Sequence, residues 1–227
     1  MLLAFLASGV GAGCGPPASR PYEPKVLLIG DSLCRRASKV VLDHLAAGRP
    51  VGLGNTYPGN RDEDPALQHN CHTGWRASTM AGQEPKQACY ARSGVCQTAL
   101  EAMVTFKPDL TFVMIGLNDK TAGRTDTQVE HSIRVLMTQL TDSNPSGRFL
   151  LASEPSGDGR TIGLNARLPQ IAAELRMAGR DVEFADVAAV MAAADYGADV
   201  AHPTADGSAK LAGAIRRFIT QCLSGSR

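Results

Sequence analysis

The sequence has no long run of charges of one sign, and aromatic residues make up only 5% of it. The 23 Lys and Arg residues nearly balance the 22 Asp and Glu residues, which leaves a formal net charge of +1. Proteins that bind nucleic acid usually concentrate basic residues on one surface, whereas the Arg pairs at 35–36 and 216–217 stand alone. We therefore expect no nucleic acid partner and interpret both pairs as solvated helix faces.

The N-terminal segment has no apolar run long enough to span a bilayer, since residues 2–13 are too few. That run fits the apolar core of a secretory signal peptide, although no Lys or Arg precedes it. Cys14 follows it in the manner of a bacterial lipoprotein cleavage site, with Gly11 where Leu is usual. We predict that residues 1–24 are a signal peptide and Pro-rich tether, and that the protein is secreted or held in the cell envelope. The sequence leaves open whether Cys14 carries a lipid. Such a lipid is the only membrane contact that we expect.

The cysteines include no C-x-x-C pair, and their irregular spacing disfavours a zinc site. In an exported chain they are instead expected to form disulfides. Cys34 is interpreted as a small apolar filler at the start of a helix, with pairing to a loop cysteine as the alternative. The disulfide candidates, whose pairing the sequence leaves open, are Cys71, Cys89, Cys96 and Cys222.

Five short apolar runs recur along the chain and are the candidate strands of a sheet. Continuous apolar runs of this length are typical of strands buried on both faces of a parallel sheet. At 227 residues the chain is long enough to bury a large core of this kind in one domain. The runs lie at 25–30, 50–55, 109–116, 148–153 and 182–187.

Helix-like stretches separate these runs and complete an α/β pattern. Strands and helices that alternate predict a three-layer α/β/α sandwich around a five-stranded parallel sheet, here one domain over residues 25–224. Residues 56–95 interrupt the pattern with polar, turn-rich sequence, and we expect an elaborated loop over the carboxyl edge of the sheet. The predicted helices span residues 35–47, 94–106, 126–142, 161–179 and 205–222.

Four short motifs lie where this fold would bring them to one edge of the sheet. A serine between a strand and a helix is often only a helix cap, so Ser32 alone would prove little. The ordered set favours catalysis, because parallel strands deliver their carboxyl ends to the same edge. The motifs are Gly-Asp-Ser-Leu at 30–33, Thr-Gly-Trp at 73–75, Gly-Leu-Asn-Asp at 116–119 and Asp-Val-Ala-His-Pro at 199–203.

These motifs contain the groups that acyl transfer requires. Ser32 becomes a nucleophile when a base such as His202 takes its proton, and Asp199 can hold the imidazole tautomer. The backbone N–H groups of Ser32 and Gly74 and the side-chain amide of Asn118 can stabilise an oxyanion. Supporting roles are assigned to Asp31, Asp119 and Trp75, and Asp195 is an alternative to Asp199.

The four motifs, in this order, resemble those of the SGNH (GDSL-type) hydrolase superfamily, and the resemblance covers residues 25–222. It implies a flavodoxin-like α/β/α sandwich that needs no metal and no organic cofactor. It also implies Ser32 as nucleophile, Gly74 and Asn118 in the oxyanion hole, and Asp199 with His202 as acid and base. The G-x-S-x-G motif of α/β-hydrolases is absent around Ser32.

The second block is similar to the His-x-x-His-Ser-Gly-Trp stretch of SGNH carbohydrate esterases such as acetyl-xylan esterases. Here it reads from His69 and His72 to Trp75, with Cys71 in place of the usual Gly and Thr73 in place of Ser. Both histidines are interpreted as partners in loop hydrogen bonds. Trp75 is either a loop anchor or a platform on which a sugar ring stacks.

The resulting prediction is an exported serine esterase, with removal of O-acetyl groups from a glycan as the best guess. A lysophospholipase- or thioesterase-type lipid esterase is the alternative among enzymes. A catalytically silent, glycan-binding surface lipoprotein is the alternative outside them. The expected partner is therefore an ester substrate, an acetylated glycan or a small acyl ester, and the oligomeric state is not predicted.

Overall fold

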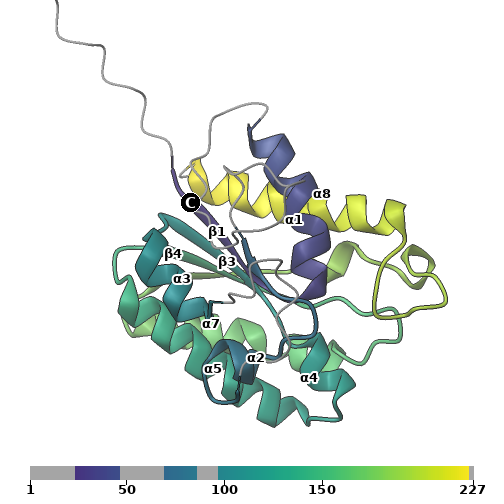
Figure 1. Cartoon of the computed structure of the whole chain (residues 1–227), viewed down its shortest axis with the longest axis horizontal. Coiled ribbons are helices and arrows are strands. Elements are labelled where there is room, and N and C mark those ends of the chain that lie inside the picture. The colour runs from purple at the N-terminus through teal and green to yellow at the C-terminus, as the bar shows by residue number, and fades with distance from the viewer. Residues whose placement is uncertain (1–23, 47–68, 86–96, 225–227) are drawn as a thin grey trace, which may run out of the picture.

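A computed structural model describes residues 24–46, 69–85 and 97–224, which contain one five-stranded, all-parallel sheet in the order β2-β1-β3-β4-β5 (Figure 1). Each strand is short, and β1 and β3 are buried along their whole length. The strands are β1 (Val26–Gly30), β2 (His69–Cys71), β3 (Leu110–Met114), β4 (Arg148–Ala152) and β5 (Asp181–Ala185).

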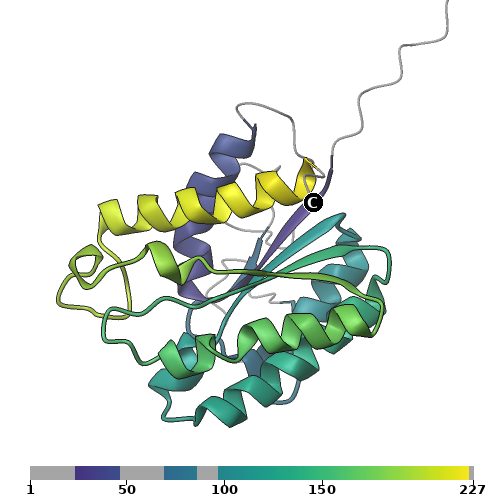
Figure 2. The same cartoon turned by 180° about the vertical axis from the view of Figure 1, so that it is seen from behind.

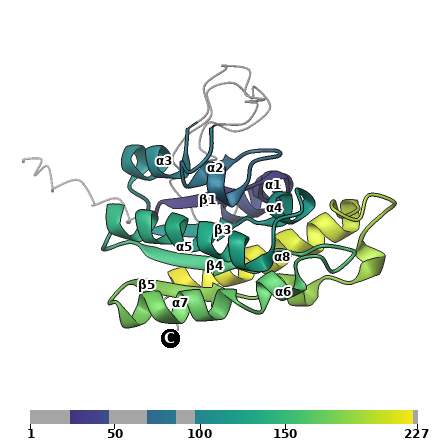
Figure 3. The same cartoon turned by 90° about the horizontal axis from the view of Figure 1, so that it is seen from below.

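Helices cover both faces of the sheet and form the outer layers of a sandwich (Figures 2 and 3). Two long helices, α1 (Ser32–Ala46) and α8 (Ala205–Leu223), pack side by side on one face. The other face carries α2 (Ala77–Met80), α3 (Ala99–Phe106), α5 (Asp126–Ser143) and α7 (Leu168–Met177). Two short helices, α4 (Leu117–Thr121) and α6 (Ile162–Asn165), follow β3 and β4.

The apolar run of β1 shows why a two-faced sheet suits this sequence. Val26 and Leu28 point into the core under α1 and α8, whereas Leu27 and Ile29 point into the core under α3 and α5. All four side chains are at most 1% exposed. Because neighbouring side chains of a strand alternate between faces, an unbroken apolar run satisfies both cores.

The predicted α/β/α sandwich is confirmed, and four of the five predicted strands coincide with β1, β3, β4 and β5. The candidate strand at 50–55 lies outside the described residues. The expectation of an elaborated loop over 56–95 is wrong at 69–71, which form edge strand β2, and at 77–80, which form α2. His-Asn-Cys has no apolar run, so hydrophobic patterning could not find it.

Helix positions agree with the pattern, with three differences, of which the first is that α3 begins at Ala99 and not at the predicted start of the stretch at 94–106. α1 begins at Ser32, three residues before the predicted start, and the stretch at 161–179 is divided into α6 and α7. α8 begins after Thr204, whose hydroxyl accepts the Gly207 N–H at 3.2 Å as an N-cap. In the part of the chain that the structure describes, no helix is both long and apolar enough to cross a membrane.

The carboxyl edge of the sheet gathers the ends of β1, β2 and β3. Gly30 at the end of β1 is in register with Cys71 of β2 and with Met114 of β3. The chain then turns at Gly116 with φ of 138°, a conformation that residues with side chains rarely adopt. A Cβ atom there would also lie 2.7 Å from Leu164 Cδ2, so this turn requires glycine.

Candidate active site

Ser32 is the first residue of α1 and directly follows the turn at the end of β1. Its hydroxyl does not cap the helix, because Asp31 Oδ1 accepts the Leu33 N–H at 2.9 Å. Ser32 Oγ instead lies 2.9 Å from His202 Nε2. The local structure therefore assigns the capping role to the aspartate and leaves the serine hydroxyl to the histidine.

His202 lies in the loop before α8 and links Ser32 to Asp199. Its Nδ1 is 2.5 Å from Asp199 Oδ2, and the Asp199 carboxylate also accepts the Ala201 N–H at 3.0 Å. The hydrogen bond from His202 holds the pKa of Asp199 below its usual range. The alternative acid, Asp195, is ion-paired with Lys210 at 2.8 Å. The structure thus places Asp199, and not Asp195, against the imidazole.

The groups expected to bind an oxyanion lie in the segments that follow β1, β2 and β3. Gly74 has φ of 82° in an exposed turn, and neither its N–H nor that of Ser32 has a hydrogen-bond acceptor among the described residues. Asn118 Nδ2 donates to the Trp75 carbonyl at 3.0 Å and to Asp31 Oδ2 at 3.3 Å. Asn118 is therefore anchored between the serine turn and the loop that carries Gly74.

Trp75 is completely buried and its ring stacks on His72, with the ring centroids 4.0 Å apart. His72 Nε2 lies 3.1 Å from the Gln97 carbonyl oxygen, and His69 Nδ1 accepts the Cys71 N–H at 3.4 Å. Because Trp75 presents no surface to solvent, the structure favours the loop anchor over the sugar-stacking platform.

A disulfide between Cys34 and Cys71 ties α1 to β2, with Cα atoms 5.6 Å apart. The prediction of Cys71 as a disulfide residue is confirmed. For Cys34 the interpretation as an apolar filler is wrong, and the alternative, pairing with a cysteine of the predicted loop, is the one found. Cys222 was also a disulfide candidate, and it is a free thiol in α8. Cys14, Cys89 and Cys96 lie outside the described residues. Because Cys34 follows Ser32 by two residues and Cys71 precedes Gly74 by three, the bridge holds these two turns together.

Glu154 is a residue of this region that the sequence patterns did not indicate. It follows β4 within the sequence Ser-Glu-Pro and is completely buried, as are Asp31 and Asp119. Burial raises the pKa of Asp31 to about 7 and that of Asp119 to about 6. Burial also raises the pKa of Glu154 well above its usual range, and both aspartates add to the effect. The one sign of Glu154 in the sequence is that this charged residue directly follows the apolar run at 148–153.

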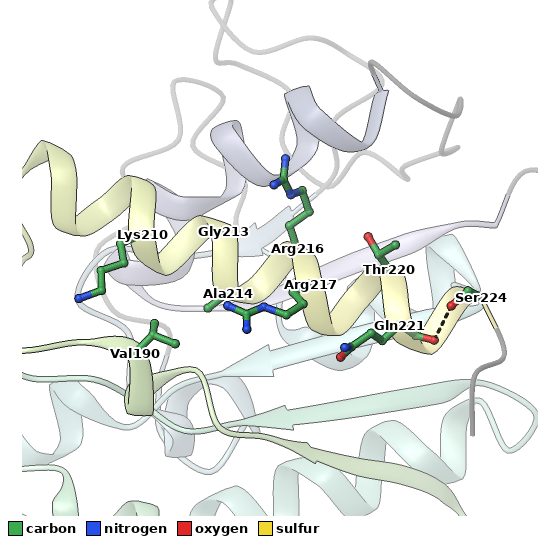
Figure 4. A pocket seen from close by; sticks show the side chains of 9 residues that line it. All are labelled: Val190, Lys210, Gly213, Ala214, Arg216, Arg217, Thr220, Gln221 and Ser224. Atoms are coloured by element: carbon green, nitrogen blue, oxygen red, sulfur yellow. Dashed lines mark hydrogen bonds between the residues drawn. The ribbon is translucent and has the colours of Figure 1, made fainter.

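A hollow along α8 is lined by residues outside this site (Figure 4). It has a volume of about 640 Å³ and is lined by Lys210, Arg216, Arg217 and neighbouring residues. Arg216 and Arg217 extend from α8 in different directions (Figure 4). Among the described residues, no group of three or more His, Cys, Asp or Glu side chains could hold a metal ion.

The sequence of residues 28–210 matches the model of the GDSL-like Lipase/Acylhydrolase family. The chain belongs to this family. Membership of this family supports ester hydrolysis as the class of reaction of this GDSL-like acylhydrolase. No curated protein sequence matches the chain.

Solved structures similar to this GDSL-like acylhydrolase include two carbohydrate esterases. A carbohydrate esterase family 3 protein from Talaromyces cellulolyticus is 22% identical, with a TM-score of 0.70 over 88% of this chain and 98% of that one. A family 3 carbohydrate esterase from Clostridium thermocellum is 20% identical, with a TM-score of 0.69 over 90% and 100%. A lipolytic protein of the G-D-S-L family from Veillonella parvula is 17% identical, with a TM-score of 0.53 over 87% and 98%. At these identities the likeness establishes the shared fold.

Proposed function

We propose that this protein is a serine esterase in which Ser32 is the nucleophile. The observation that carries the proposal is the 2.9 Å contact between Ser32 Oγ and His202 Nε2, continued by the 2.5 Å contact between His202 Nδ1 and Asp199. In the first step His202 takes the Ser32 proton while Oγ bonds to the ester carbonyl carbon. The imidazolium then gives that proton to the departing alcohol, and the acyl group stays on Ser32.

The second step regenerates the enzyme by hydrolysis of the acyl-serine. Water loses a proton to His202 and adds to the acyl carbon, after which the same proton returns to Ser32 Oγ as the carboxylic acid departs. Asp199 acts throughout as an acceptor for His202 Nδ1 and stabilises the imidazolium without taking its proton.

Both tetrahedral intermediates need hydrogen-bond donors on the side of the carbonyl oxygen. The N–H groups of Ser32 and Gly74 are suited to this role, because no acceptor among the described residues occupies them. Asn118 is the third donor that we propose. Its bond to Asp31 is the longer of its two, at 3.3 Å, so that N–H can be shared between Asp31, which orients the amide, and an oxyanion, while the bond to the Trp75 carbonyl is kept.

The substrate that we propose is an O-acetylated glycan. Both carbohydrate esterases described above have the same fold over nearly their whole length. The side chain of Asp199 is 61% exposed and that of His202 26% exposed, so the site opens directly at the surface, as a polymeric alcohol requires. We further propose that the protein is exported, with its tether and Cys14 N-terminal to the catalytic domain.

Turnover of p-nitrophenyl acetate and of p-nitrophenyl octanoate by wild type and Ser32→Ala tests the activity and separates the two enzyme classes. We expect acetate to be released much faster than octanoate, and Ser32→Ala to lose nearly all turnover. Ser38→Ala is a matched control, because Ser38 is a buried serine of the same helix whose hydroxyl donates to the Arg35 carbonyl. A preference for octanoate would favour the lipid esterase. Equal, negligible turnover by wild type and Ser32→Ala would favour the glycan-binding lipoprotein.

A further inference from the structure

Three carboxyl groups lie buried together behind the proposed nucleophile. Asp31 follows β1, Asp119 lies in α4 after β3, and Glu154 follows β4, and each is 0% exposed. These strands are neighbours in the sheet, in the order β1-β3-β4, so their carboxyl ends lie next to one another. Glu154 interacts electrostatically with both aspartates. The cluster therefore joins the serine turn to the end of β4.

The three carboxyl groups differ in the donors that stabilise a negative charge. Asp31 accepts hydrogen bonds from the Leu33 N–H at 2.9 Å and from Asn118 Nδ2 at 3.3 Å. Asp119 accepts the Ala77 N–H at 2.8 Å, and its other oxygen lies 3.9 Å from Arg124 Nε. Neither carboxyl oxygen of Glu154 has a hydrogen-bond partner among the described residues. A buried charge without donors is strongly disfavoured, so Glu154 is the member of the cluster that should be neutral.

We propose that Glu154 is a positioning residue that keeps its carboxyl proton and thereby allows Asp31 to ionise and accept the hydrogen bond from Asn118. If Glu154 lost the proton, its charge would repel that of Asp31. The aspartate would then be driven to bind a proton itself, and its hold on the Asn118 amide would weaken. The role assigned to Asn118 rests on the proposed esterase function, whereas the location of the proton does not.

The surroundings of Glu154 support a neutral side chain. Its backbone is fixed by Asn165, whose side chain accepts the Glu154 N–H and donates to the Glu154 carbonyl, both at 2.9 Å. The titratable groups that face the carboxyl are Asp31, Asp119 and Tyr196. Burial raises the pKa of Tyr196 to about 12, so this phenol also stays neutral. Asp31 and Asp119 both favour the protonated form, and within residues 24–46, 69–85 and 97–224 no cation is among the groups that act on the Glu154 carboxyl.

Infrared spectroscopy of the folded full chain locates the proton directly, without any substrate. A protonated carboxylic acid has a C=O stretching band that a carboxylate lacks. We expect this band in the wild type at a pH above 7, where Asp31 and Asp119, with pKa values of about 7 and about 6, are mostly ionised, and we expect it to be lost in Glu154→Gln. Glu183→Gln, which changes an exposed glutamate of β5, should leave the band intact. A wild type without the band, or a Glu154→Gln spectrum that still contains it unchanged, would overturn the proposal.

The pH dependence of turnover tests the positioning role. In the wild type and in Glu183→Gln, kcat should fall at alkaline pH as Glu154 ionises, while KM changes little. Glu154→Gln is neutral at every pH, so it should keep kcat within about threefold of wild type at pH 7 and should lose this alkaline fall. The same alkaline profile in all three proteins, or a large loss of kcat in folded Glu154→Gln at pH 7, would contradict it. If no ester were turned over at all, the proposed function would fail while the infrared result would still decide where the proton lies.

Discussion

Ser32 Oγ lies 2.9 Å from His202 Nε2, although 170 positions separate the two residues in the chain. One comes from the turn after β1 and the other from the loop that leads into α8. The helices that follow them, α1 and α8, pack against each other on the same face of the sheet. The contact between the two side chains is thus a consequence of how those helices pack, and it is fixed by core residues far from the surface.

Replacement of Asp199 by Asn tests whether the carboxylate holds the imidazole. The substitution removes the acceptor that lies 2.5 Å from His202 Nδ1, so we expect kcat to fall by about 10²–10⁴. Asp195→Asn is the control, because that aspartate lies four positions earlier and pairs with Lys210 instead. Steady-state kinetics of both variants would show which aspartate acts on His202. A larger loss of kcat in Asp195→Asn than in Asp199→Asn would assign this role to Asp195 instead.

Asn118→Ala removes one of the three proposed oxyanion donors. Loss of one such donor typically lowers kcat by about 10²–10³, with a small effect on KM. Asn144→Ala, which removes a side chain that donates to the Pro108 carbonyl just after α5, is the control for general damage. Thermal unfolding must accompany the kinetics, since Asn118 also holds the Trp75 carbonyl. Near-normal kcat in a folded Asn118→Ala protein would exclude the oxyanion role.

The sequence was sufficient for the parts of this fold that depend on local patterns. Buried parallel strands such as β3 need continuous apolar runs, and α8 needs a capping Thr204 followed by apolar residues at helical spacing. The motifs around Ser32, Asn118 and His202 were recognisable because each directly follows a strand or precedes a helix. Their meeting at one edge follows from the parallel topology.

The sequence was insufficient where a residue's role depends on distant neighbours. β2 is three residues long and polar, and only its pairing with β1 makes it a strand. Cys34 occupies a helix position that suits any small apolar residue, and its bond to Cys71 depends on that same pairing. Glu154 has no motif of its own, because its environment is made by residues from two other strand ends.

Reduction of the Cys34–Cys71 disulfide should destabilise the protein and loosen the site. The bridge closes a loop over a sequence separation of 37 residues, for which a loss of roughly 2–4 kcal/mol is expected. The double variant Cys34→Ala/Cys71→Ala should therefore unfold at lower denaturant concentration and have a lower kcat, because the turn that carries Gly74 is no longer tied to α1. Cys222→Ser should match the wild type in both measurements.

The stability of the protein should depend on pH through Asp119. Burial raises the pKa of this carboxyl from 3.8 to about 6, so the folded state holds its proton more tightly than the unfolded chain does. Stability from this group is therefore fully present below about pH 4 and is lost as the pH rises through about 6. Asp119→Asn, which can still accept the Ala77 N–H, should stabilise the protein by about 1–3 kcal/mol at pH 8 and by much less at pH 4. The free energies of unfolding at both pH values check this, with Asp142→Asn, a change at an exposed aspartate, as the control. The same pH dependence of stability in the two variants would contradict the assignment to Asp119.

Trp75→Ala distinguishes a buried anchor from a sugar platform. A tryptophan on which a sugar stacks is exposed, and its loss raises KM for the glycan while stability is unchanged. Trp75 is 0% exposed and stacks on His72 in the core beneath the loop, so its truncation should cost about 3–5 kcal/mol of unfolding free energy. Trp75→Phe keeps an aromatic ring against His72 and should recover part of that loss. An unchanged unfolding free energy together with a raised KM for acetylated glycan, but not for p-nitrophenyl acetate, would instead place Trp75 in the substrate site.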